Sequence, residues 1–402
     1  MVHAKWSGQQ DNASSALGMG LVRYRKHASL PPPALARFSV RLDMPQLVVD
    51  MRVLSSRETC SGASAARLRI CARRPRASPS LAAPQAQQAA AGGAPEPRRV
   101  VAVTGATGFV GSALVRRLLQ SGARVRVLTR DVPKARRTLP AVPIDCFYEE
   151  QAWGKGIAGA TAVVNLAGEP ISKGRWSPEI KRLIKTSRLG ATTRVVSAMS
   201  ECAPEERPAV LVTASAVGYY GTSSSSRFDE SSSNGSDYLA EVCRDWEAAA
   251  MPAAALGARV VVLRMGIVLD KGGGALASMA PVFQAFAGGP LGDGRQWLSW
   301  VHRDDAVGII CRAIEDASVS GAYNVTAPRP VRMGEFCQSL GAAVGRPSWL
   351  PVPEFAVQVL LGEGAKVVLE GQQVLPTRTL ASGYRFRFSE VAPALRDIIS
   401  SR

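Results

Sequence analysis

A short apolar stretch that runs directly into three evenly spaced glycines constrains the fold of this chain more than any other feature. Residues 100–111 read Val-Val-Ala-Val-Thr-Gly-Ala-Thr-Gly-Phe-Val-Gly. Gly105 suits a tight strand-to-helix turn, Gly108 lets the backbone approach a pyrophosphate, and Gly111 lets the helix pack closely on the sheet. Phosphates at such a turn lie at a helix N-terminus, where amide groups and the helix dipole favour negative charge. The run therefore predicts a dinucleotide-binding turn.

The residues that follow have the spacing of one βαβ unit. Val110, Leu114 and Leu118 recur at helical spacing, and Gly122 is the predicted C-cap. A second apolar strand is predicted over residues 125–129. The order of strand, glycine turn, helix and strand distinguishes a dinucleotide site from a glycine-rich turn of another kind.

The end of this second strand predicts which dinucleotide binds. Sites for NAD(H) usually have an Asp or Glu there, which binds the ribose 2′-hydroxyl. This chain has Thr129 and Arg130, and the first acidic residue is Asp131. A guanidinium at this point suits a 2′-phosphate through charge-assisted, bidentate hydrogen bonds. We therefore favour NADP(H) over NAD(H) as the cofactor; a solvated surface arginine is the alternative interpretation of Arg130.

The first 97 residues differ in composition from the rest of the chain. They hold 13 Lys or Arg residues against 5 Asp or Glu, within a chain of net charge +17. The segment is rich in Ser, Ala and Pro, and residues 75–97 are of low complexity. We interpret residues 1–97 as an organelle transit peptide and a disordered linker. A plastid is the favoured location and a mitochondrion the alternative. A basic nucleic-acid-binding arm is the weaker interpretation, because the basic residues are scattered.

Cysteine and histidine usage excludes several kinds of site. Seven scattered cysteines without a CxxC pair argue for a reducing compartment and against a disulfide framework or structural zinc. His302 is the one histidine after residue 97, which excludes a His-based metal cage and a Ser-His-Asp triad. No apolar run has the length of a membrane span. Residues 178–189 are the one candidate for a membrane-surface helix, and a sheet-packing helix is the simpler interpretation.

Residues 98 to about 330 alternate between strand-like and helix-like segments, which predicts an α/β domain with a doubly wound parallel sheet. Segments of a smaller lobe begin at about residue 270, and residues 345–395 form an appended C-terminal segment. The remaining expected elements are buried strands at 161–168, 208–215 and 259–264, helices at 178–199 and 238–256, and a flexible Ser-rich loop at 222–236. Loops after the strands bind ligands in such sheets, which makes residues 165–168 and 215–221 site candidates.

Several longer strings follow the glycine motif in a fixed order. They are 163–171 (Val-Val-Asn-Leu-Ala-Gly-Glu-Pro-Ile), 175–176 (Arg-Trp), 215–221 (Ser-Ala-Val-Gly-Tyr-Tyr-Gly), 238–247 (Tyr-Leu-Ala-Glu-Val-Cys-Arg-Asp-Trp-Glu), 263–269 (Leu-Arg-Met-Gly-Ile-Val-Leu), 289–297 (Gly-Pro-Leu-Gly-Asp-Gly-Arg-Gln-Trp), 299–305 (Ser-Trp-Val-His-Arg-Asp-Asp) and 324–328 (Asn-Val-Thr-Ala-Pro). With them, residues 100 to about 395 resemble the short-chain dehydrogenase/reductase superfamily, and more closely its atypical, NAD(P)-dependent epimerase/dehydratase-like branch. The resemblance implies an extended Rossmann fold that binds NADP(H), a cleft beside a smaller C-terminal lobe, and a family-specific C-terminal domain at 345–395.

The resemblance also implies which residues bind the dinucleotide. Those at the pyrophosphate are Gly105, Thr107, Gly108, Phe109 and Val110, beside Gly111 of the glycine motif. By the same resemblance Arg130 binds the 2′-phosphate. Leu166, Ala167 and Gly168 lie along the adenosine ribose and the diphosphate, and Glu169 lies near the ribose.

The acid–base pair of the superfamily, a Tyr with a Lys four residues later, is incomplete in this chain. Tyr238 stands at the Tyr position, 23 residues after Ser215, but Val242 stands at the Lys position. A phenol with a pKa near 10 is only about 0.3% ionised at pH 7.5. A neighbouring Glu241 would raise the pKa of Tyr238 further.

Two functions therefore remain open. The first is an NADP-dependent oxidoreductase or epimerase-like enzyme on a small substrate, in which Ser215 binds the substrate oxygen and Tyr238 or Tyr219 transfers the proton. The second is a nucleotide-binding protein with weak or no catalysis that acts through protein partners. Plant relatives of this branch are linked with plastid division at the inner envelope, which favours the second.

Two further strings have a structural interpretation beside a functional one. Residues 289–297 with Trp300 form either a wall of the substrate cleft or the packing between the two lobes. Asp304 and Asp305 precede the apolar run 307–310, and with His302 they are expected to cap a helix and brace the small lobe. A catalytic pair of carboxylates is the alternative interpretation of the two aspartates.

Overall fold

A computed structural model describes residues 99–172 and 174–401 of the chain. The predicted transit peptide and linker at 1–97 lie outside these residues.

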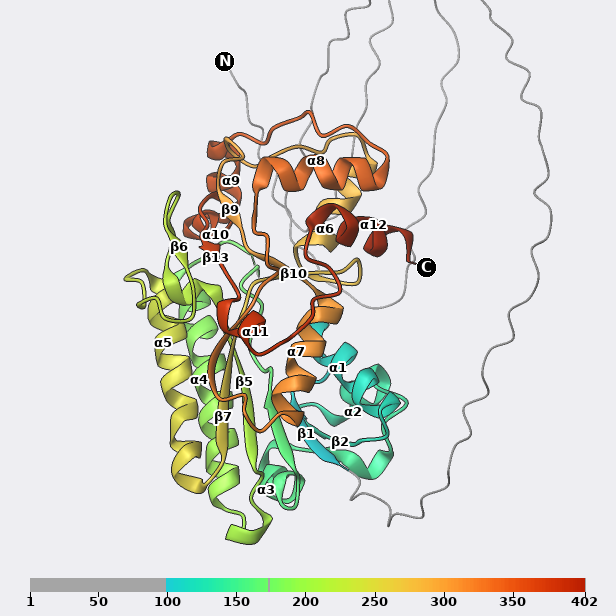
Figure 1. Cartoon of the computed structure of the whole chain (residues 1–402), viewed down its shortest axis with the longest axis vertical. Helices are drawn as coiled ribbons and strands as arrows, with labels where there is room; N and C mark the ends of the chain where they lie inside the picture. Colours follow the sequence, from blue (N-terminus) through green and yellow to red (C-terminus); the bar gives the residue numbers. More distant parts are fainter. Residues whose placement is uncertain (1–98, 173, 402) are drawn as a thin grey trace, which may run out of the picture. The chain divides into compact units, whose positions relative to one another are not determined.

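A seven-stranded parallel sheet forms the centre of the described chain (Figure 1). The strand order is β3-β2-β1-β4-β5-β7-β11, and every neighbouring pair is parallel. The strands are β1 (Val100–Thr104), β2 (Arg124–Leu128), β3 (Phe147–Tyr148), β4 (Ala162–Asn165), β5 (Val210–Ala216), β7 (Arg259–Met265) and β11 (Gly321–Val325). The order reverses between β1 and β4, so the carboxyl ends of these two strands are the point where such a sheet binds ligands. The predicted doubly wound parallel sheet is confirmed.

Helices cover both faces of this sheet, and the strand sequences explain why. Val101 and Val103 pack toward the first helical layer, whereas Ala102 packs toward the second, so β1 has apolar residues on both sides. The first layer contains α1 (Phe109–Gln120), α2 (Val132–Thr138) and α7 (Arg303–Glu315). The second layer contains α3 (Trp153–Ile157), α4 (Pro178–Ser200) and α5 (Tyr238–Ala250).

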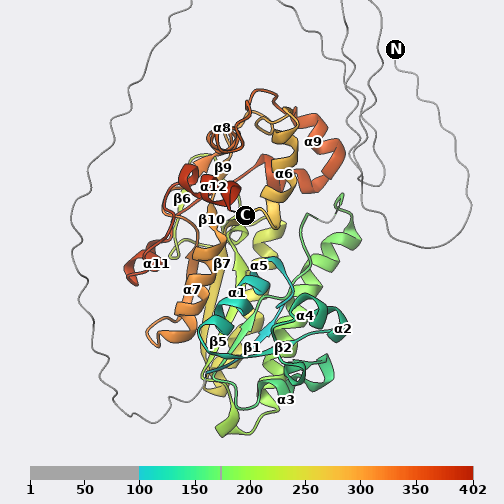
Figure 2. The ribbon, with the colours of Figure 1, turned by 90° about the vertical axis from the view of Figure 1, so that its right-hand side faces the viewer.

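The smaller lobe begins directly after β7 and has its own apolar core. Figures 1 and 2 place α6, α8, α9 and α12 together at one end of the sheet. The elements of the lobe are β8 (Ile267–Leu269), α6 (Gly274–Gln284), β9 (Trp297–Leu298), β10 (Trp300–His302), β12 (Val331–Arg332), α8 (Met333–Val344), α9 (Glu354–Leu361), α10 (Lys366–Leu369), β13 (Gln373–Val374) and α12 (Val391–Ser400). Between β13 and α12, α11 (Thr377–Ala381) packs on β11 of the central sheet. Trp300 is fully buried in the core of the lobe with Phe283 and Phe336. Its indole therefore packs inside the lobe and does not line a cleft.

Two local expectations need correction. Residues 222–236 contain a short strand, β6 (Arg227–Phe228), which pairs with β13 of the C-terminal segment. Two residues are too few to show the alternation of a strand. The loop was therefore predicted from the Ser-rich composition of the segment alone. At the start of α7 the N-cap is His302 rather than an aspartate: its Nδ1 accepts from the Asp304 amide at 3.1 Å.

Asp305 braces the C-terminal segment, as expected. Its carboxylate is buried and accepts from the amides of Arg387 (2.7 Å) and Phe388 (3.1 Å). The segment that precedes α12 is thereby fixed to α7.

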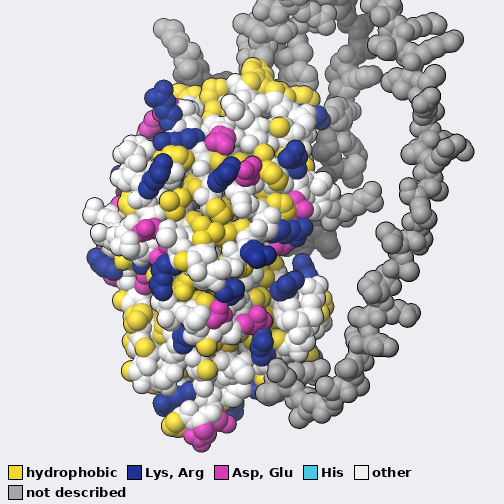
Figure 3. All heavy atoms as spheres, viewed as in Figure 1, with side chains coloured by type: hydrophobic (Ala, Val, Ile, Leu, Met, Phe, Trp, Pro, Cys, Tyr) yellow, Lys and Arg dark blue, Asp and Glu magenta, His cyan; other side chains and the backbone are white. Residues whose placement is uncertain are grey.

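Residues 178–189 form the first half of α4, in which Ile184 is buried, and Val195 and Met199 further along the helix belong to the core between the sheet and its second helical layer. The sheet-packing interpretation of residues 178–189 themselves stays a prediction. Among the described residues no helix is long and apolar enough to span a membrane. On the face shown in Figure 3, Lys and Arg side chains are interspersed with Asp and Glu.

Candidate functional site

The turn between β1 and α1 accepts only glycine at two of its positions. Gly105 has a φ of +64°, and a Cβ built there would lie 2.5 Å from the carbonyl oxygen of Leu166. A Cβ at Gly111 would lie 2.1 Å from the carbonyl oxygen of Gly105. The turn therefore lies directly against the loop after β4, with no side chain between the two backbones.

Within the described part of the chain, the first amides of α1 donate no hydrogen bond, so they can bind an anion. Gly108 is the N-cap, and neither a side-chain cap nor an acidic residue occurs in the first turn. The Phe109 ring lies against Gly273 of the small lobe, with the Arg303 guanidinium 5.4 Å from its centroid. Val110 packs against the sheet core. Phe109 and Val110 can thus meet a pyrophosphate through their amides rather than their side chains.

An open hollow of about 410 Å³ lies beside this turn, at the end of β2. Thr107, Thr129, Arg130, Asp131 and Lys134 line it. This volume is in the usual range for small-molecule sites. Asp131 caps α2 by accepting from the Lys134 amide at 2.9 Å, so its carboxylate is already engaged.

The charge of the hollow suits a phosphate. Arg130 is 73% exposed at its side chain, and its Nη2 lies 3.6 Å from Oε1 of Glu169. The structure thus brings Arg130 and Glu169 together from the ends of β2 and β4. Sequence reasoning missed Lys134, although its place in the first turn of the helix after Arg130 could have indicated it.

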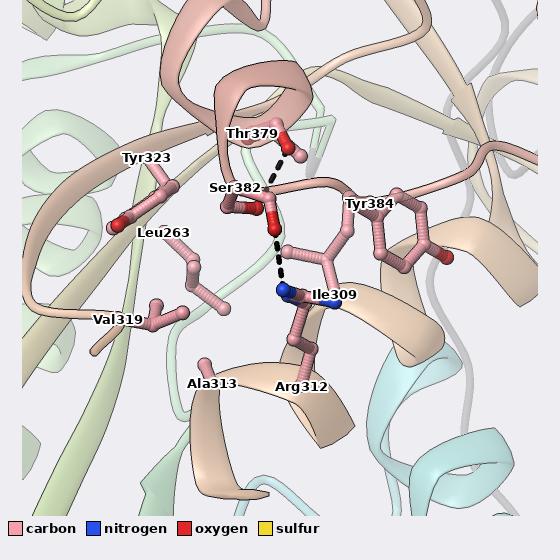
Figure 4. Close-up of a pocket in the computed structure, with 9 residues that line it drawn as sticks. All are labelled: Leu263, Ile309, Arg312, Ala313, Val319, Tyr323, Thr379, Ser382 and Tyr384. Atoms are coloured by element: carbon pink, nitrogen blue, oxygen red, sulfur yellow. Dashed lines mark hydrogen bonds between the residues drawn. The ribbon is translucent and has the colours of Figure 1, made fainter. Parts of the chain in front are cut away.

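A second cavity, shown in Figure 4, is too small to be a substrate site. It measures about 10 Å³ and lies between α7, β11 and α11, lined in part by Leu263, Ile309 and Tyr323. This is about the volume that one water molecule needs.

Asn165, at the end of β4, fixes the loop that carries Leu166, Ala167, Gly168 and Glu169. Its buried Oδ1 accepts from the Thr104 hydroxyl at 2.7 Å, and its Nδ2 donates to Thr192 Oγ1 at 2.8 Å. This side chain ties β1, β4 and α4 to one another. Further along, the Glu169 amide donates to Ser187 Oγ of α4 at 3.2 Å.

Ser215, at the end of β5, is buried and already donates its hydroxyl hydrogen. Its Oγ lies 2.6 Å from Oε1 of Glu247. Glu247 accepts two hydrogen bonds of 2.9 Å from the guanidinium of Arg264, and Arg264 donates to the Tyr220 hydroxyl at 3.0 Å. Burial acts to lower the pKa of Arg264, but the hydrogen bonds with Glu247 raise it above its ordinary value. Sequence reasoning did not identify Glu247, which lies nine residues beyond Tyr238.

Tyr219 belongs to the same group of residues. The Cζ of Arg264 lies 3.4 Å from the centroid of the Tyr219 ring, a close cation–π contact. The adjacent Tyr220 donates to Asn324 Oδ1 at 2.7 Å, and burial raises the pKa of its phenol to about 12. Ser215 and Tyr219 are therefore brought together through Arg264 and Glu247.

Tyr238 lies in a different group, between α4 and α5. Its hydroxyl donates to the carbonyl oxygen of Lys181. Burial raises the pKa of Tyr238, and the charges of Arg188 and Lys185 act against this effect. Lys185 itself forms ion pairs with two carboxylates of α5: its Nζ lies 2.6 Å from Oε1 of Glu241 and 2.8 Å from Oδ2 of Asp245. The cations near Tyr238 thus come from α4 rather than from position 242.

Trp176 packs against Tyr238, and the C-terminal segment packs against Trp176 in turn. Trp176 meets the Tyr238 ring edge-on at 5.8 Å, and its backbone pairs with Gly362 just after α9. A Cβ at Gly364 would lie 2.9 Å from the Trp176 ring, so this contact leaves no room for a side chain. Lys181 also pairs with Glu363 at 2.7 Å.

The parallel sheet, the glycine turn at its switch point and the basic hollow beside that turn define a dinucleotide-binding protein of the Rossmann class. The sequence of residues 101–326 matches the NAD dependent epimerase/dehydratase family, and residues 352–398 match a domain of unknown function (DUF1731). The chain therefore belongs to the NAD dependent epimerase/dehydratase family.

Individual relatives agree with this assignment. An Arabidopsis thaliana protein described as "Epimerase family protein SDR39U1 homolog, chloroplastic" is 55% identical over 76% of this chain and 88% of its own length. The Bacillus subtilis epimerase family protein YfhF is 38% identical over 75% of this chain and 98% of its own. A crystal structure of human epimerase family protein SDR39U1 with NADPH has a TM-score of 0.69 and 36% identity, over 75% of this chain and 100% of the human one. The expected epimerase-like family is confirmed, and the NADPH in the human structure agrees with the expected cofactor.

Proposed function

We propose that this chain is an NADP(H)-binding protein of the oxidoreductase or epimerase type. The observation that carries the proposal is the glycine turn, where Gly105 and Gly111 leave no room for a side chain, next to a hollow lined by Arg130 and Lys134. The NADPH in the crystal structure of the human relative supports it.

The residues present fit such a dinucleotide. Amides at the start of α1 hold the pyrophosphate, and Thr107 lies beside them in the wall of the hollow. Arg130 and Lys134 bind the 2′-phosphate, because two cations at the end of β2 suit a dianion. Leu166 to Gly168 continue the binding surface from the turn toward β5. When bound, the coenzyme supplies or accepts a hydride.

Turnover requires a change in the hydrogen bonds of two hydroxyl groups. Ser215 binds a substrate oxygen only after its hydroxyl leaves Glu247, and Tyr238 transfers a proton only after its hydroxyl leaves the Lys181 carbonyl. Tyr219 is the second proton donor that we propose, because its ring lies on the Arg264 guanidinium. Glu247 lies within hydrogen-bond distance of Ser215 and is the nearest base for that hydroxyl.

Titration of the full chain with NADPH and NADH tests the cofactor assignment. Arg130→Asp and Lys134→Glu should each weaken NADPH binding by about ten- to hundredfold, the value of a hydrogen bond to a charged group, and NADH binding far less. Arg137→Asp makes the same charge change on an exposed residue of α2 outside the hollow, and should leave both affinities unchanged. Equal weakening of NADPH and NADH by Arg130→Asp would remove the 2′-phosphate assignment.

The second candidate function is nucleotide binding without turnover, in which the protein acts through partners. It is favoured by the hydroxyls of Ser215 and Tyr238, which both donate inside the protein. Assays for NADPH oxidation with carbonyl compounds and nucleotide sugars distinguish the two candidates, since only an enzyme oxidises the coenzyme. A partner role in plastid division at the inner envelope stays a prediction.

We also propose a plastid location. The support is the Ser-rich, basic composition of residues 1–97 and the Arabidopsis relative, which is described as chloroplastic. Import of the full chain into isolated chloroplasts should yield a shortened product protected from external protease. Import into mitochondria alone would contradict this location.

A further inference from the structure

Arg188 is a half-buried cation on α4 that the site described above does not use. Its Nη1 donates to the carbonyl oxygens of Glu169 and Ile184, each at 3.0 Å. Its Cζ lies 5.2 Å from the centroid of the Trp246 ring. The side chain is thus held in one orientation by α4, α5 and the loop after β4.

Arg188 differs from Lys181 and Lys185 of the same helix in forming no ion pair with a carboxylate of the described residues. Lys181 pairs with Glu363 at 2.7 Å and Lys185 with Glu241 at 2.6 Å. Within residues 99–172 and 174–401, no carboxylate comes within 4.0 Å of the Arg188 guanidinium. Its two hydrogen bonds go to neutral carbonyl groups. A cation in this setting is stabilised by further oxygen acceptors.

One edge of the guanidinium is open to such acceptors. Only Nη1 makes hydrogen bonds to the described residues, and Nε and Nη2 of Arg188 are not closed off from solvent. Burial lowers the pKa of Arg188, although the guanidinium stays charged at neutral pH. A hydroxylated or anionic ligand can therefore accept two hydrogen bonds from this edge.

The position of Arg188 identifies which part of the ligand meets it. A Cβ on Gly168 would lie 3.3 Å from Cγ of Arg188, so the side chain lies directly against the loop after β4. In the sheet order β2-β1-β4-β5, the basic hollow lies at β2 and the pyrophosphate turn at β1. A dinucleotide held at those two points continues over β4 toward β5. Arg188 contacts Gly168, the last residue assigned to the diphosphate, and from there it reaches Trp246 of α5 and acts to lower the pKa of Tyr238 by its charge, so it lies on the α5 side of the diphosphate.

We propose that Arg188 binds the hydroxyl groups of the second ribose of the dinucleotide, the one that carries the nicotinamide. This inference rests on the proposed NADP(H) binding and assigns a residue to the far half of the same site.

Three ligands of increasing length test this assignment by calorimetry on the full chain, with adenosine 2′,5′-bisphosphate as a check of folding. 2′-Phospho-ADP has both pyrophosphate phosphates but lacks the second ribose, 2′-phospho-ADP-ribose includes it, and NADPH adds the nicotinamide. Arg188→Met should weaken 2′-phospho-ADP-ribose and NADPH by about ten- to hundredfold, and 2′-phospho-ADP and the bisphosphate by less than about twofold. Arg188→Lys, which keeps the charge, should recover part of the loss. Arg182→Met, an exposed arginine of the same helix, is the matched control and should bind all three as the wild type does.

Unchanged binding of the bisphosphate also shows that Arg188→Met is folded. Equal weakening of all three ligands, or of none, would overturn the role of Arg188 while leaving NADP(H) binding by the wild type intact. Failure of the wild type to bind either NADPH or the bisphosphate is a different result, and it would remove the proposed function together with this inference.

Discussion

Gly111→Ala tests the physical basis of the dinucleotide turn, because an ordinary helix would gain stability from the same change. Alanine is normally favoured over glycine inside a helix by about 1 kcal/mol. At position 111 the new methyl group would lie 2.1 Å from the Gly105 carbonyl oxygen and 2.9 Å from Cα of Ala106. Both contacts are with backbone atoms, so the whole turn must move. Overpacking of this kind costs about 1–3 kcal/mol.

Gly190→Ala is the matched control. Gly190 lies within α4, is exposed, and would have no atom within 4 Å of its new methyl group. The helix preference for alanine is common to both variants, so they should differ by the overpacking cost of about 1–3 kcal/mol in the free energy of unfolding, with Gly190→Ala the more stable. Urea unfolding measures this difference, and titration with NADPH should show a loss of at least about tenfold, or ~1.4 kcal/mol, for Gly111→Ala alone. A Gly111→Ala protein as stable as Gly190→Ala, with wild-type NADPH affinity, would refute the reasoning.

Three further predictions concern the packing around the site. Glu247→Gln leaves the Arg264 guanidinium, whose side chain is only 6% exposed, without its counter-charge. The free energy of unfolding, measured by urea unfolding, should therefore fall by about 3–5 kcal/mol. Burial lowers the pKa of His302, so the stabilising effect of its neutral ring is complete above about pH 6.5 and is lost as the pH falls through the lower pKa of the folded state. His302→Asn keeps an N-cap side chain and should therefore lose less melting temperature than the wild type below pH 6.5. The same dependence of melting temperature on pH in both proteins would contradict this. Gly364→Val should displace Trp176 from Tyr238 and speed protease cleavage between residues 354 and 365. An unchanged cleavage rate would show that the contact between Gly364 and Trp176 is not needed to hold residues 354–365 in place.

Local patterns were sufficient to predict the dinucleotide turn and the sheet around it. Gly105 and Gly111 are required by close contacts with backbone atoms of the same turn and of the loop after the neighbouring strand β4. The apolar runs of β1, β4 and β5 are long enough to be recognised as strands in the sequence. The prediction of Arg130 as a ligand of the coenzyme rested on its place after β2, and the structure adds Lys134 to the same hollow.

The partners of the catalytic candidates were not predictable in the same way. Ser215 meets Glu247 across 32 residues of sequence, and Tyr238 meets the Lys181 carbonyl across 57. Such contacts depend on how α4 and α5 pack side by side, which no local spacing encodes. The pairing of β6 with β13 joins residues about 146 positions apart, so it too could not be predicted from local spacing.

All the roles proposed for this site require an adenine dinucleotide that binds at the amides at the start of α1. A crystal structure of the full chain grown with excess NADPH tests this binding most directly. We expect the pyrophosphate at the amides of Phe109 and Val110, with the 2′-phosphate between Arg130 and Lys134. NADPH bound elsewhere on the protein, or a turn that stays empty at saturating coenzyme, would contradict it.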